Sequence, residues 1–587
     1  MPPADTCPQG TTSLASAPAV TPARWRILVV AVAVTALFFQ LGARALNDPD
    51  EGRYAEIARE MLVSGDYLTP RFNGVVHLAK PPVTYWLAAA SMKLFGVNEF
   101  AARLPAALAA LGTLAAMYLL LRNAVGEAVA LCSVLVLLTC TQFFVMARVI
   151  TTDMLMTCWT CWSVWFLWRW YAPADRSWRK LVWFYVFLGL NLLTKGPVGV
   201  ALTLLAVAGL RWRNNDMLLR QMHWGKGALV VLAIATPWFV ALAVRDPSAW
   251  EYFLLREVVD RVAGDAHDRR EVWWYFAPVL AGGMLPWTIF LIPATILLRG
   301  AGGRAGHLLR MLAVWAGGGF VLFTLSQSKL PSYTLPLCPP LAALVGATLM
   351  QIVTDKRLAR GNRLVPAICS VALLSYAGSV VALTLWLRGK FDVDWTVMVP
   401  VFLVTALGLV ACGVCAFLRR ERAFACALGA TALATLLGCV SVVPSMERNL
   451  GYKAGAKFLA AAIVQRDPTG EAAVVSYNVL MPAVPFYLQR TVIWYVSPRA
   501  GRNKSKPKST LDRSSLEVRA SVPPNTEALR GALAGSARVF WVAPTKNVPR
   551  IENELGLQLE VIEQVGTFAA AMSSSTNAVA ASTAAPP

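Results

Sequence analysis

Two acidic residues, Asp50 and Glu51, follow the first long apolar run of the chain, in the stretch DPDEGRYAE at residues 48–56. Residues 27–46 carry one charge and are long enough to cross a bilayer, so the carboxylates stand at its water boundary. Carboxylates there neither help insertion nor pack in lipid, which favours a chemical role. The alternative is an acidic turn that starts an interfacial helix, where Asp is common. We predict a chemical role, with Asp50 at the start of a helix in the membrane interface.

Two further ionisable groups lie at comparable places. Asp153 stands at the outer end of a later apolar run, so one carboxylate could act as base while the other holds a sugar hydroxyl or an ammonium. The alternative for Asp153 is an ion pair with Arg148. Lys80 ends a polar loop beside the apolar segment 81–96, where an ammonium can bind a lipid phosphate. Ordinary snorkelling of Lys80 to the headgroups explains the same position.

Two more outward loops combine basic and aromatic residues. Arg269 and Arg270 suit phosphate or pyrophosphate, because guanidinium binds these groups through two parallel hydrogen bonds. The aromatic run at 273–275 that follows them is typical of an interfacial anchor. The stretch SKLPSY adds Lys329 and Tyr333 to the same outer face.

Composition identifies the class of protein that carries these groups. Of 587 residues, 57% are hydrophobic and 15% charged, which is typical of a polytopic membrane protein. The net charge of +21 could fit a nucleic-acid partner. However, the basic residues fall mostly in short loops between apolar runs, where positive charge sets membrane orientation. We therefore predict a membrane protein that binds no nucleic acid.

Thirteen apolar runs are candidate membrane spans. They are 27–46, 104–121, 127–147, 151–171, 181–194, 196–211, 227–245, 274–299, 309–326, 332–353, 363–387, 395–417 and 423–447. An odd number places the two termini on opposite sides. Basic residues fill seven consecutive loops on the N-terminal side, which is the positive-inside pattern. Counting segment 81–96 as a span would break that pattern, so we predict a re-entrant or interfacial segment there.

A second domain follows the last span. Helix and strand patterns alternate in a small α/β module, with a helix at 453–465, strands at 473–480 and 537–543, and a helix–strand pair at 545–570. The basic segment 499–513 between its halves is predicted to be a mobile loop. The predicted organisation is a disordered cytoplasmic N-terminus at 1–23, a membrane domain at 24–447 with outer-face loops 47–103 and 246–273, an extracytoplasmic α/β domain at 448–568, and a disordered tail at 569–587.

Four motifs carry a family resemblance. In chain order, DPDEGRYAEIARE, LAKPP, TTDM and SKLPSYTLP resemble the bacterial lipid A aminoarabinose transferases, which belong with the protein O-mannosyltransferases to the GT-C glycosyltransferases. The likeness runs from Ile27 through Leu335. It implies an all-α polytopic membrane protein of GT-C type with about 13 transmembrane helices and a small C-terminal α/β extracytoplasmic domain.

The resemblance also implies an activity. The expected enzyme is an inverting glycosyltransferase of the bacterial inner membrane that acts on the periplasmic side without a nucleotide or other cofactor. Its donor is an undecaprenyl-phosphate-linked sugar, 4-amino-4-deoxy-L-arabinose or a related amino sugar, and its acceptor is lipid A or another outer-face molecule. Two alternatives stay open: a polyprenyl-phosphate-mannose-dependent protein O-mannosyltransferase, and a lipid or sugar transporter. Transporters place ionisable groups near the bilayer midplane, whereas this chain keeps most charges at span ends.

The roles of Asp50, Asp153, Lys80 and Tyr333 are implied by their positions in the matching motifs, and the other roles are predicted from residue type and place near the outer face. The predicted catalytic residues are Asp50 and Asp153; the donor-phosphate residues are Lys80, Arg53, Arg269, Arg270 and Lys329; the substrate-binding residues are Glu51, Tyr54, Tyr85, His267 and Tyr333. One position departs from the family. The aminoarabinose enzymes commonly carry Glu before the Lys-Pro pair, and that glutamate is associated with a bound metal, whereas this chain has Ala79. His267 thereby loses a co-ligand, and we predict no metal.

Overall fold

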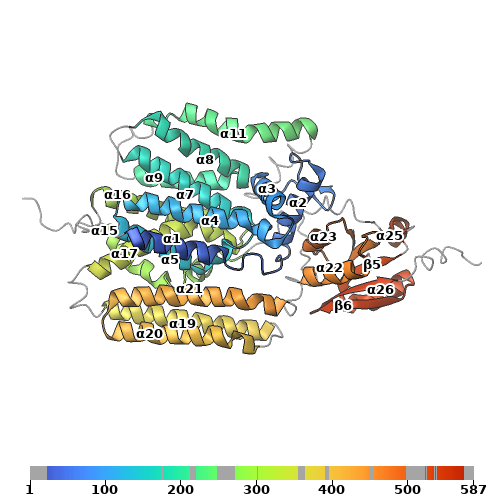
Figure 1. Cartoon of the computed structure of the whole chain (residues 1–587). Coiled ribbons are helices and arrows are strands. Elements are labelled where there is room, and N and C mark those ends of the chain that lie inside the picture. Colours follow the sequence, from blue (N-terminus) through green and yellow to red (C-terminus); the bar gives the residue numbers. More distant parts are fainter. Residues whose placement is uncertain are drawn as a thin grey trace, which may run out of the picture.

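Most of the chain is α-helical, and its helices lie side by side in one bundle with a small α/β domain at one end (Figure 1). The computed structural model describes residues 23–172, 176–211, 220–247, 271–300, 302–354, 364–390, 395–447, 455–497 and, except for 524, 535 and 537, 523–573. Apart from the first, which is longer than its helix, every predicted span coincides with one helix or with consecutive helices. The predicted polytopic helical fold with a small C-terminal α/β domain is confirmed.

The bundle alternates long helices with shorter or broken ones. Its elements are α1 (Ala23–Phe38), α4 (Glu99–Arg122), α5 (Glu127–Thr139), α6 (Thr141–Met146), α7 (Thr152–Tyr171), α8 (Trp178–Lys195), α9 (Pro197–Arg211), α11 (Trp224–Arg245), α14 (Phe276–Gly283), η2 (Thr288–Phe290), α15 (Leu291–Gly300), α16 (Gly303–Leu325), η3 (Pro331–Leu337), α17 (Cys338–Thr354), α19 (Leu364–Lys390), η4 (Trp395–Met398), α20 (Val399–Phe417) and α21 (Glu421–Met446). Among the described residues, six helices are long and apolar enough to cross a membrane, or seven spans if one bent pair is included. The count of thirteen therefore stays a prediction.

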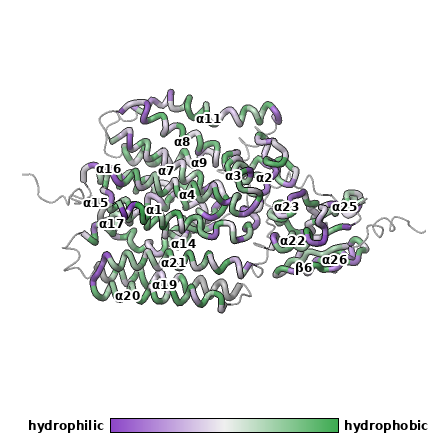
Figure 2. The backbone as a smooth tube through the Cα atoms, in the orientation of Figure 1, coloured by the Kyte–Doolittle hydropathy of each residue, from purple (hydrophilic) through white to green (hydrophobic). Residues whose placement is uncertain are grey.

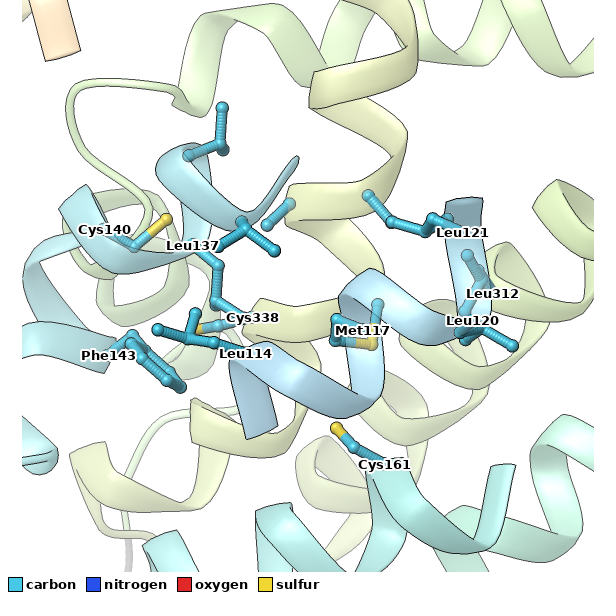
Figure 3. Close-up of a cluster of buried hydrophobic side chains, with 14 of the residues drawn as sticks. Leu114, Met117, Leu120, Leu121, Leu137, Cys140, Phe143, Cys161, Leu312 and Cys338 are labelled. Atoms are coloured by element: carbon cyan, nitrogen blue, oxygen red, sulfur yellow. The ribbon is translucent and has the colours of Figure 1, made fainter. Parts of the chain in front are cut away.

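The helices of the bundle pack through apolar side chains. The helices are hydrophobic along most of their length, and the hydrophilic residues gather towards their ends (Figure 2). In the interior, Leu114 and Met117 of α4 lie near Leu137 of α5, Cys161 of α7 and Cys338 of α17 (Figure 3). These cysteines are fully buried or nearly so, which fits a packing role.

The first span is shorter than predicted. The sequence predicts a span to residue 46, but α1 ends at Phe38. The cause is Arg148, whose guanidinium donates hydrogen bonds to the carbonyl oxygens of Ala36, Leu37 and Phe39. A helix leaves its last carbonyls without intrahelical partners, and a basic side chain that takes them stabilises the end.

The run at 274–299 is not one straight helix either. Its two halves, Phe276–Gly283 and Thr288–Thr295, meet at an angle of 108°. Pro286 lies in the break, where a ring without an N–H cannot continue the helical ladder. The halves therefore form a broken span or a re-entrant loop.

The first outward segment covers one end of the bundle beside the C-terminal domain (Figure 1). It contains α2 (Asp50–Ser64), a short hairpin of β1 (Arg71–Phe72) and β2 (Val75–Val76), and α3 (Val83–Phe95). With 13 residues, α3 is too short to span a bilayer, in keeping with the treatment of segment 81–96 as a non-spanning piece.

The C-terminal domain is a five-stranded sheet with helices on both faces. Its elements are α22 (Gly455–Arg466), β3 (Ala473–Tyr477), α23 (Ala483–Leu488), β4 (Ile493–Tyr495), α25 (Thr526–Leu533), β5 (Val539–Pro544), η8 (Thr545–Asn547), α26 (Val548–Leu555), β6 (Leu559–Val565) and β7 (Phe568–Ser573). The strand order is β4-β3-β5-β7-β6, with β3 parallel to both neighbours and β7 antiparallel to β5 and β6. One face packs on α22 and α23, the other on α25 and α26.

The C-terminal boundary of this domain differs from the prediction. Residues 569–573 were assigned to a disordered tail because the segment is rich in Ala and Ser. They belong to β7, which lies between β5 and β6. Ala569, Ala570 and Ala571 are almost fully buried, so small side chains are what the space between two helical layers admits. Residues 574–587, 1–22 and the predicted loop 499–513 lie outside the described residues.

Candidate active site

Asp50 is the first residue of α2, and its side chain is 55% exposed at the end of the bundle. Arg53, one helical turn later, donates a hydrogen bond of 2.6 Å from Nη2 to its Oδ1. Residues three apart lie on the same face of a helix, so this pair presents a carboxylate and a guanidinium together. Helix starts also favour acidic groups because the free amides point at them.

Glu51, the next residue, points to the opposite side and is 1% exposed. Its two oxygens accept bonds from Nε and Nη2 of Arg103 at 2.8 and 2.9 Å, and Arg44 adds a third contact at 2.8 Å. Burial opposes ionisation of Glu51, but Arg103 and Arg44 outweigh it and lower its pKa to about 2. We had predicted that Glu51 contacts substrate. In the structure, the Glu51 carboxylate is buried and bonded to Arg103, and this contact joins α2 to α4.

Asp153 begins α7 on the other side of the site and is nearly buried. Its Oδ1 pairs with Nζ of Lys195, the last residue of α8. The alternative pairing with Arg148 is wrong, because Arg148 holds the carbonyls at the end of α1. Nζ of Lys195 also lies 4.8 Å from the ring centroid of Tyr333, which is a cation–π distance. Asp153, Lys195 and Tyr333 therefore form one connected group.

Tyr54 connects the two carboxylates. Its ring packs on Tyr85 of α3 with centroids 5.6 Å apart, and both side chains are almost buried. Burial raises the pKa of Tyr54 above its usual range, and Asp50 and Asp153 both raise it further. Tyr54 also makes a side-chain hydrogen bond with Thr152, the first residue of α7, so the starts of α2 and α7 lie near each other. The predicted substrate residues Tyr54 and Tyr85 therefore pack together near the start of α7, and their contact with substrate stays a prediction.

Basic residues gather next to Asp50. Lys80, which is partly exposed, donates from Nζ to the carbonyl oxygen of Ala79 at 2.6 Å. His77 is 3% exposed, and burial, then Arg53 and then Lys80 lower its pKa to about 3. The charges of Arg53 and Lys80 both act on the His77 imidazole, so both cations lie near this one histidine. The pair offers positive charge where a phosphate could bind.

Lys329 occupies a different environment. Its Nζ donates to the carbonyl oxygen of Glu271 at 3.4 Å, and the side chain is nearly buried. Tyr333, in η3, stacks on Phe276 with centroids 6.5 Å apart. Through Glu271, Lys329 is tied to the segment that precedes α14. Its predicted role at the donor phosphate stays a prediction.

Three predicted residues lie outside the described ranges: Arg269, Arg270 and His267. The described residues contain no group of three His, Cys, Asp or Glu side chains placed to hold a metal ion. The predicted absence of a metal is not tested by this, because His267 falls in the gap between residues 247 and 271.

Sequence reasoning missed two residues of the site, Lys195 and His77. Lys195 lies between two apolar runs, and its partner Asp153 is 42 residues away, so no local pattern indicates the pair. His77 could have been found, since it stands three residues before Lys80 in the same polar loop.

Comparisons with known proteins show to which family the chain is similar. Residues 79–240 match the dolichyl-phosphate-mannose-protein mannosyltransferase family. The undecaprenyl phosphate-alpha-4-amino-4-deoxy-L-arabinose arabinosyl transferase of Edwardsiella ictaluri is 33% identical over 54% of this chain and 57% of its own length. The enzyme of the same name from Erwinia tasmaniensis is 31% identical over 68% of this chain and 73% of its own length.

Solved structures extend the likeness over nearly the whole fold. ArnT from Cupriavidus metallidurans, crystallised bound to undecaprenyl phosphate, superposes with a TM-score of 0.76 at 25% identity, covering 94% of this chain and 98% of that one. Its apo crystal structure gives a TM-score of 0.75 at 26% identity, covering 96% and 99% of the two chains. The sequence matches to the first three curated relatives span 57–64% of their lengths. The two carboxylates at converging helix starts thus lie within a shared fold, and this chain belongs to the family of undecaprenyl phosphate-alpha-4-amino-4-deoxy-L-arabinose arabinosyl transferases.

Proposed function

We propose that this protein transfers 4-amino-4-deoxy-L-arabinose from undecaprenyl phosphate to a phosphate of lipid A, on the periplasmic face of the inner membrane. The observation that carries the proposal is the convergence of Asp50–Arg53 and Asp153–Lys195 on Tyr54, at one end of a multi-pass bundle. Sequence likeness to the arabinosyl transferases and structural likeness to ArnT bound to undecaprenyl phosphate support the donor.

The chemistry needs charge neutralisation more than proton transfer. The bond between the anomeric carbon and the donor phosphate oxygen breaks, and undecaprenyl phosphate leaves with the electron pair. Lys80 and Arg53 would bind the negative charge that develops on that oxygen, the kind of electrostatic effect that usually contributes most to catalysis. An oxygen of the acceptor phosphate forms the new bond, and because it is already anionic no base has to remove a proton.

Asp50 has a separate task in this scheme. Its exposed carboxylate would stabilise the positive charge that develops at the sugar carbon or orient the acceptor. Oδ1 of Asp153 pairs with Lys195, and Oδ2 would hold a sugar hydroxyl or the sugar ammonium. Tyr333 lies against Lys195 and would complete that side of the sugar site.

Protein O-mannosyl transfer is the second candidate, because residues 79–240 match the mannosyltransferase family. A serine or threonine hydroxyl must lose a proton during attack, so Asp50 would then act as general base. The two reactions place different demands on the same carboxylate.

Mass spectrometry of lipid A from cells with and without the gene tests the proposal. We expect a mass increment of one aminopentose on lipid A that requires the gene. Purified protein should make the same product from the undecaprenyl-linked sugar and lipid A in detergent. A chain that modifies only a peptide acceptor would favour the mannosyltransferase, and transport of donor lipid without product would exclude both enzymes.

A further inference from the structure

Residues 45–48, which lead into Asp50, are held by hydrogen bonds to residues far along the chain. After α1 ends, the amide of Ala45 donates to Oε1 of Glu447 at 2.6 Å, and the amide of Leu46 donates to the hydroxyl of Tyr487 at 2.8 Å. Glu447 ends the last membrane helix, and Tyr487 belongs to α23 of the C-terminal domain. Two successive backbone groups are thus satisfied by residues about 400 positions later in the chain.

Asp48, two residues after Leu46, makes the reciprocal contact. Its Oδ1 accepts a hydrogen bond of 2.9 Å from the amide of Ala483, at the start of α23, and the side chain is 2% exposed. The amides in the first turn of a helix have no intrahelical acceptor, so Asp48 supplies one across the domain boundary. Asp50 lies two residues beyond this contact.

Gly52 brings the two backbones together on the other side of Asp50. A Cβ at this position would lie 2.5 Å from the amide nitrogen of Ala483 and 2.3 Å from Oδ1 of Asp48. No side chain fits there, which shows how closely α2 and α23 approach. The contact is therefore a backbone-to-backbone fit and not a loose surface encounter.

A shared apolar core reinforces this contact along α2. Tyr54, Ile57 and Met61 of α2 belong to the same buried cluster as Met481 and Phe486 of the C-terminal domain. The β1–β2 hairpin adds a paired contact, since the side-chain amide of Asn73 both donates to and accepts from the backbone of Val492. The C-terminal domain thus contacts both α2 and the β1–β2 hairpin of the first outward segment.

We propose that the C-terminal domain is part of the transfer machinery, and that Asp48 and Tyr487 are positioning residues that fix where α2 begins. Asp50 and Arg53 bond to each other on one helix, so their place relative to Asp153 depends on that starting point. A displacement of about 1 Å in a reacting group can cost on the order of a hundredfold in rate. This inference rests on the transfer reaction proposed above.

Four variants of the full-length protein test the inference. Tyr487→Phe removes the acceptor of the Leu46 amide, Asp48→Ala removes the acceptor of the Ala483 amide, and Gly52→Ala pushes the two backbones apart. Asp48→Asn keeps an oxygen that can accept. The matched control is Tyr495→Phe, because that hydroxyl bonds Thr526 within the C-terminal domain and not the segment before Asp50.

Two readouts separate positioning from folding and from failure of the proposed function. We expect Tyr487→Phe, Asp48→Ala and Gly52→Ala to lower kcat at least tenfold with a donor KM within threefold of wild type. Hydrogen exchange of the amides at residues 45–52 should accelerate in the same variants. Asp48→Asn should recover most of the rate, and Tyr495→Phe should match wild type in both measurements.

Unchanged exchange at residues 45–52 in all three variants would show that the contacts do not hold the segment, and the inference would be overturned. Accelerated exchange with wild-type kcat would overturn it as well, since the segment would then be loose without consequence. Hydrogen exchange needs no substrate, so it measures the contacts even if the wild-type protein makes no product. Absence of product would contradict the proposed function, and the exchange data would still test the contacts.

Discussion

Asp50 and Asp153 are both carboxylates at helix starts, yet their surroundings give them different tasks. Asp50 is more than half exposed and bonds to Arg53, whereas Asp153 is 8% exposed and paired with Lys195. An exposed carboxylate can approach a substrate and respond to a developing charge. A buried, paired carboxylate is better suited to fix geometry. The division between chemistry and orientation follows from these environments.

At this scale the first prediction concerns Asp50. Asp50→Asn should reduce transfer by at least a hundredfold, because the carboxylate that stabilises the positive sugar carbon loses its negative charge. Thermal unfolding of the variant in detergent should stay unchanged. Turnover of the purified variant and its melting curve measure the two effects. The surface variant Glu560→Gln, whose side chain is 62% exposed, is the control and should retain full activity. Wild-type turnover in Asp50→Asn would remove it from the chemistry.

Lys80 carries the second prediction. If its ammonium binds the donor phosphate, Lys80→Ala should weaken donor binding roughly 10- to 100-fold, the range for a hydrogen bond to a charged group. Lys80→Arg should keep part of the affinity, since the charge remains but the geometry changes. Titration with donor lipid measures both, with Lys93→Ala as the control because Lys93 is exposed in the last turn of α3. Equal affinity in Lys80→Ala and wild type would reduce Lys80 to a snorkelling residue.

The sequence offers Asp50 and Lys80 as candidates because each lies at the edge of an apolar run. It could not separate Asp50 from Glu51, since the two are neighbours in the chain and differ only in which side of α2 they face. Consecutive helical residues are rotated by about 100°, and only the position of Arg103 decides which of them points inward. Lys195 was missed for a related reason, because its role depends on a partner in another helix.

Helices around the site are joined through buried charge rather than through apolar packing alone. Arg103 of α4 donates to Glu51 and to the carbonyls of Leu41, Arg44 and Ala45. A guanidinium with so many fixed acceptors sets the path of the chain between α1 and α2. Removing one partner from such a network leaves a buried charge uncompensated. The loss of folding stability is then far larger than for a surface ion pair.

The third prediction belongs to this network. Glu51→Gln should destabilise the protein by about 3 to 5 kcal/mol, because Arg103 is left buried without its anionic partner. In wild type, the pKa of Glu51 is lowered to about 2, so its stabilisation is complete above its ordinary pKa and is lost as pH falls from about 4.5 towards 2. Thermal unfolding against pH measures this loss, which should be absent in Glu51→Gln.

Asp50→Asn is the matched control for Glu51→Gln, since the two carboxylates are adjacent in sequence. The first variant should lose activity and keep its stability, and the second should lose stability. Equal melting temperatures for Glu51→Gln and wild type between pH 5 and 8 would show that the network does not hold the fold.

At the scale of the whole molecule, the C-terminal domain lies at the end of the bundle where α1 delivers the chain to α2 (Figure 1). Thirteen crossings would place that domain on the side opposite the N-terminus. The contacts of Leu46 and Asp48 with α23 require the domain and the site to share one side of the membrane.

The fourth prediction tests this topology. An alkaline phosphatase reporter fused after residue 448 should be active, because the positive-inside pattern places that end outside the cytoplasm. The same reporter fused after Asn123, in the short loop between α4 and α5, should be inactive. Activity of the second fusion and silence of the first would reverse the orientation and place the site in the cytoplasm.

The sequence predicted the class of the whole molecule and the presence of its second domain, because apolar length and alternating helix and strand patterns are local properties. It did not predict that the two domains share a buried cluster, since Phe72 packs on Trp494 across more than 400 residues with centroids 5.0 Å apart. Contacts between residues so far apart depend on the tertiary fold, and they produce no periodic pattern in the sequence. The break at 274–299 was not predicted although Pro286 lies in it, because membrane helices tolerate proline and the run is apolar throughout.

The bonds from Leu46 to Tyr487 and from Asp48 to Ala483 span 441 and 435 positions of sequence, and this has a consequence for biogenesis. Translation at roughly 5–20 residues per second separates the two halves of each bond by about 20 to 90 seconds. During that interval the first outward segment is already synthesised but lacks the acceptors and donors that fix it. If the C-terminal domain fixes the start of α2 as proposed, a nascent chain carries Asp50 and Lys80 before the site is complete. Truncated products of translation would then be unable to transfer the sugar.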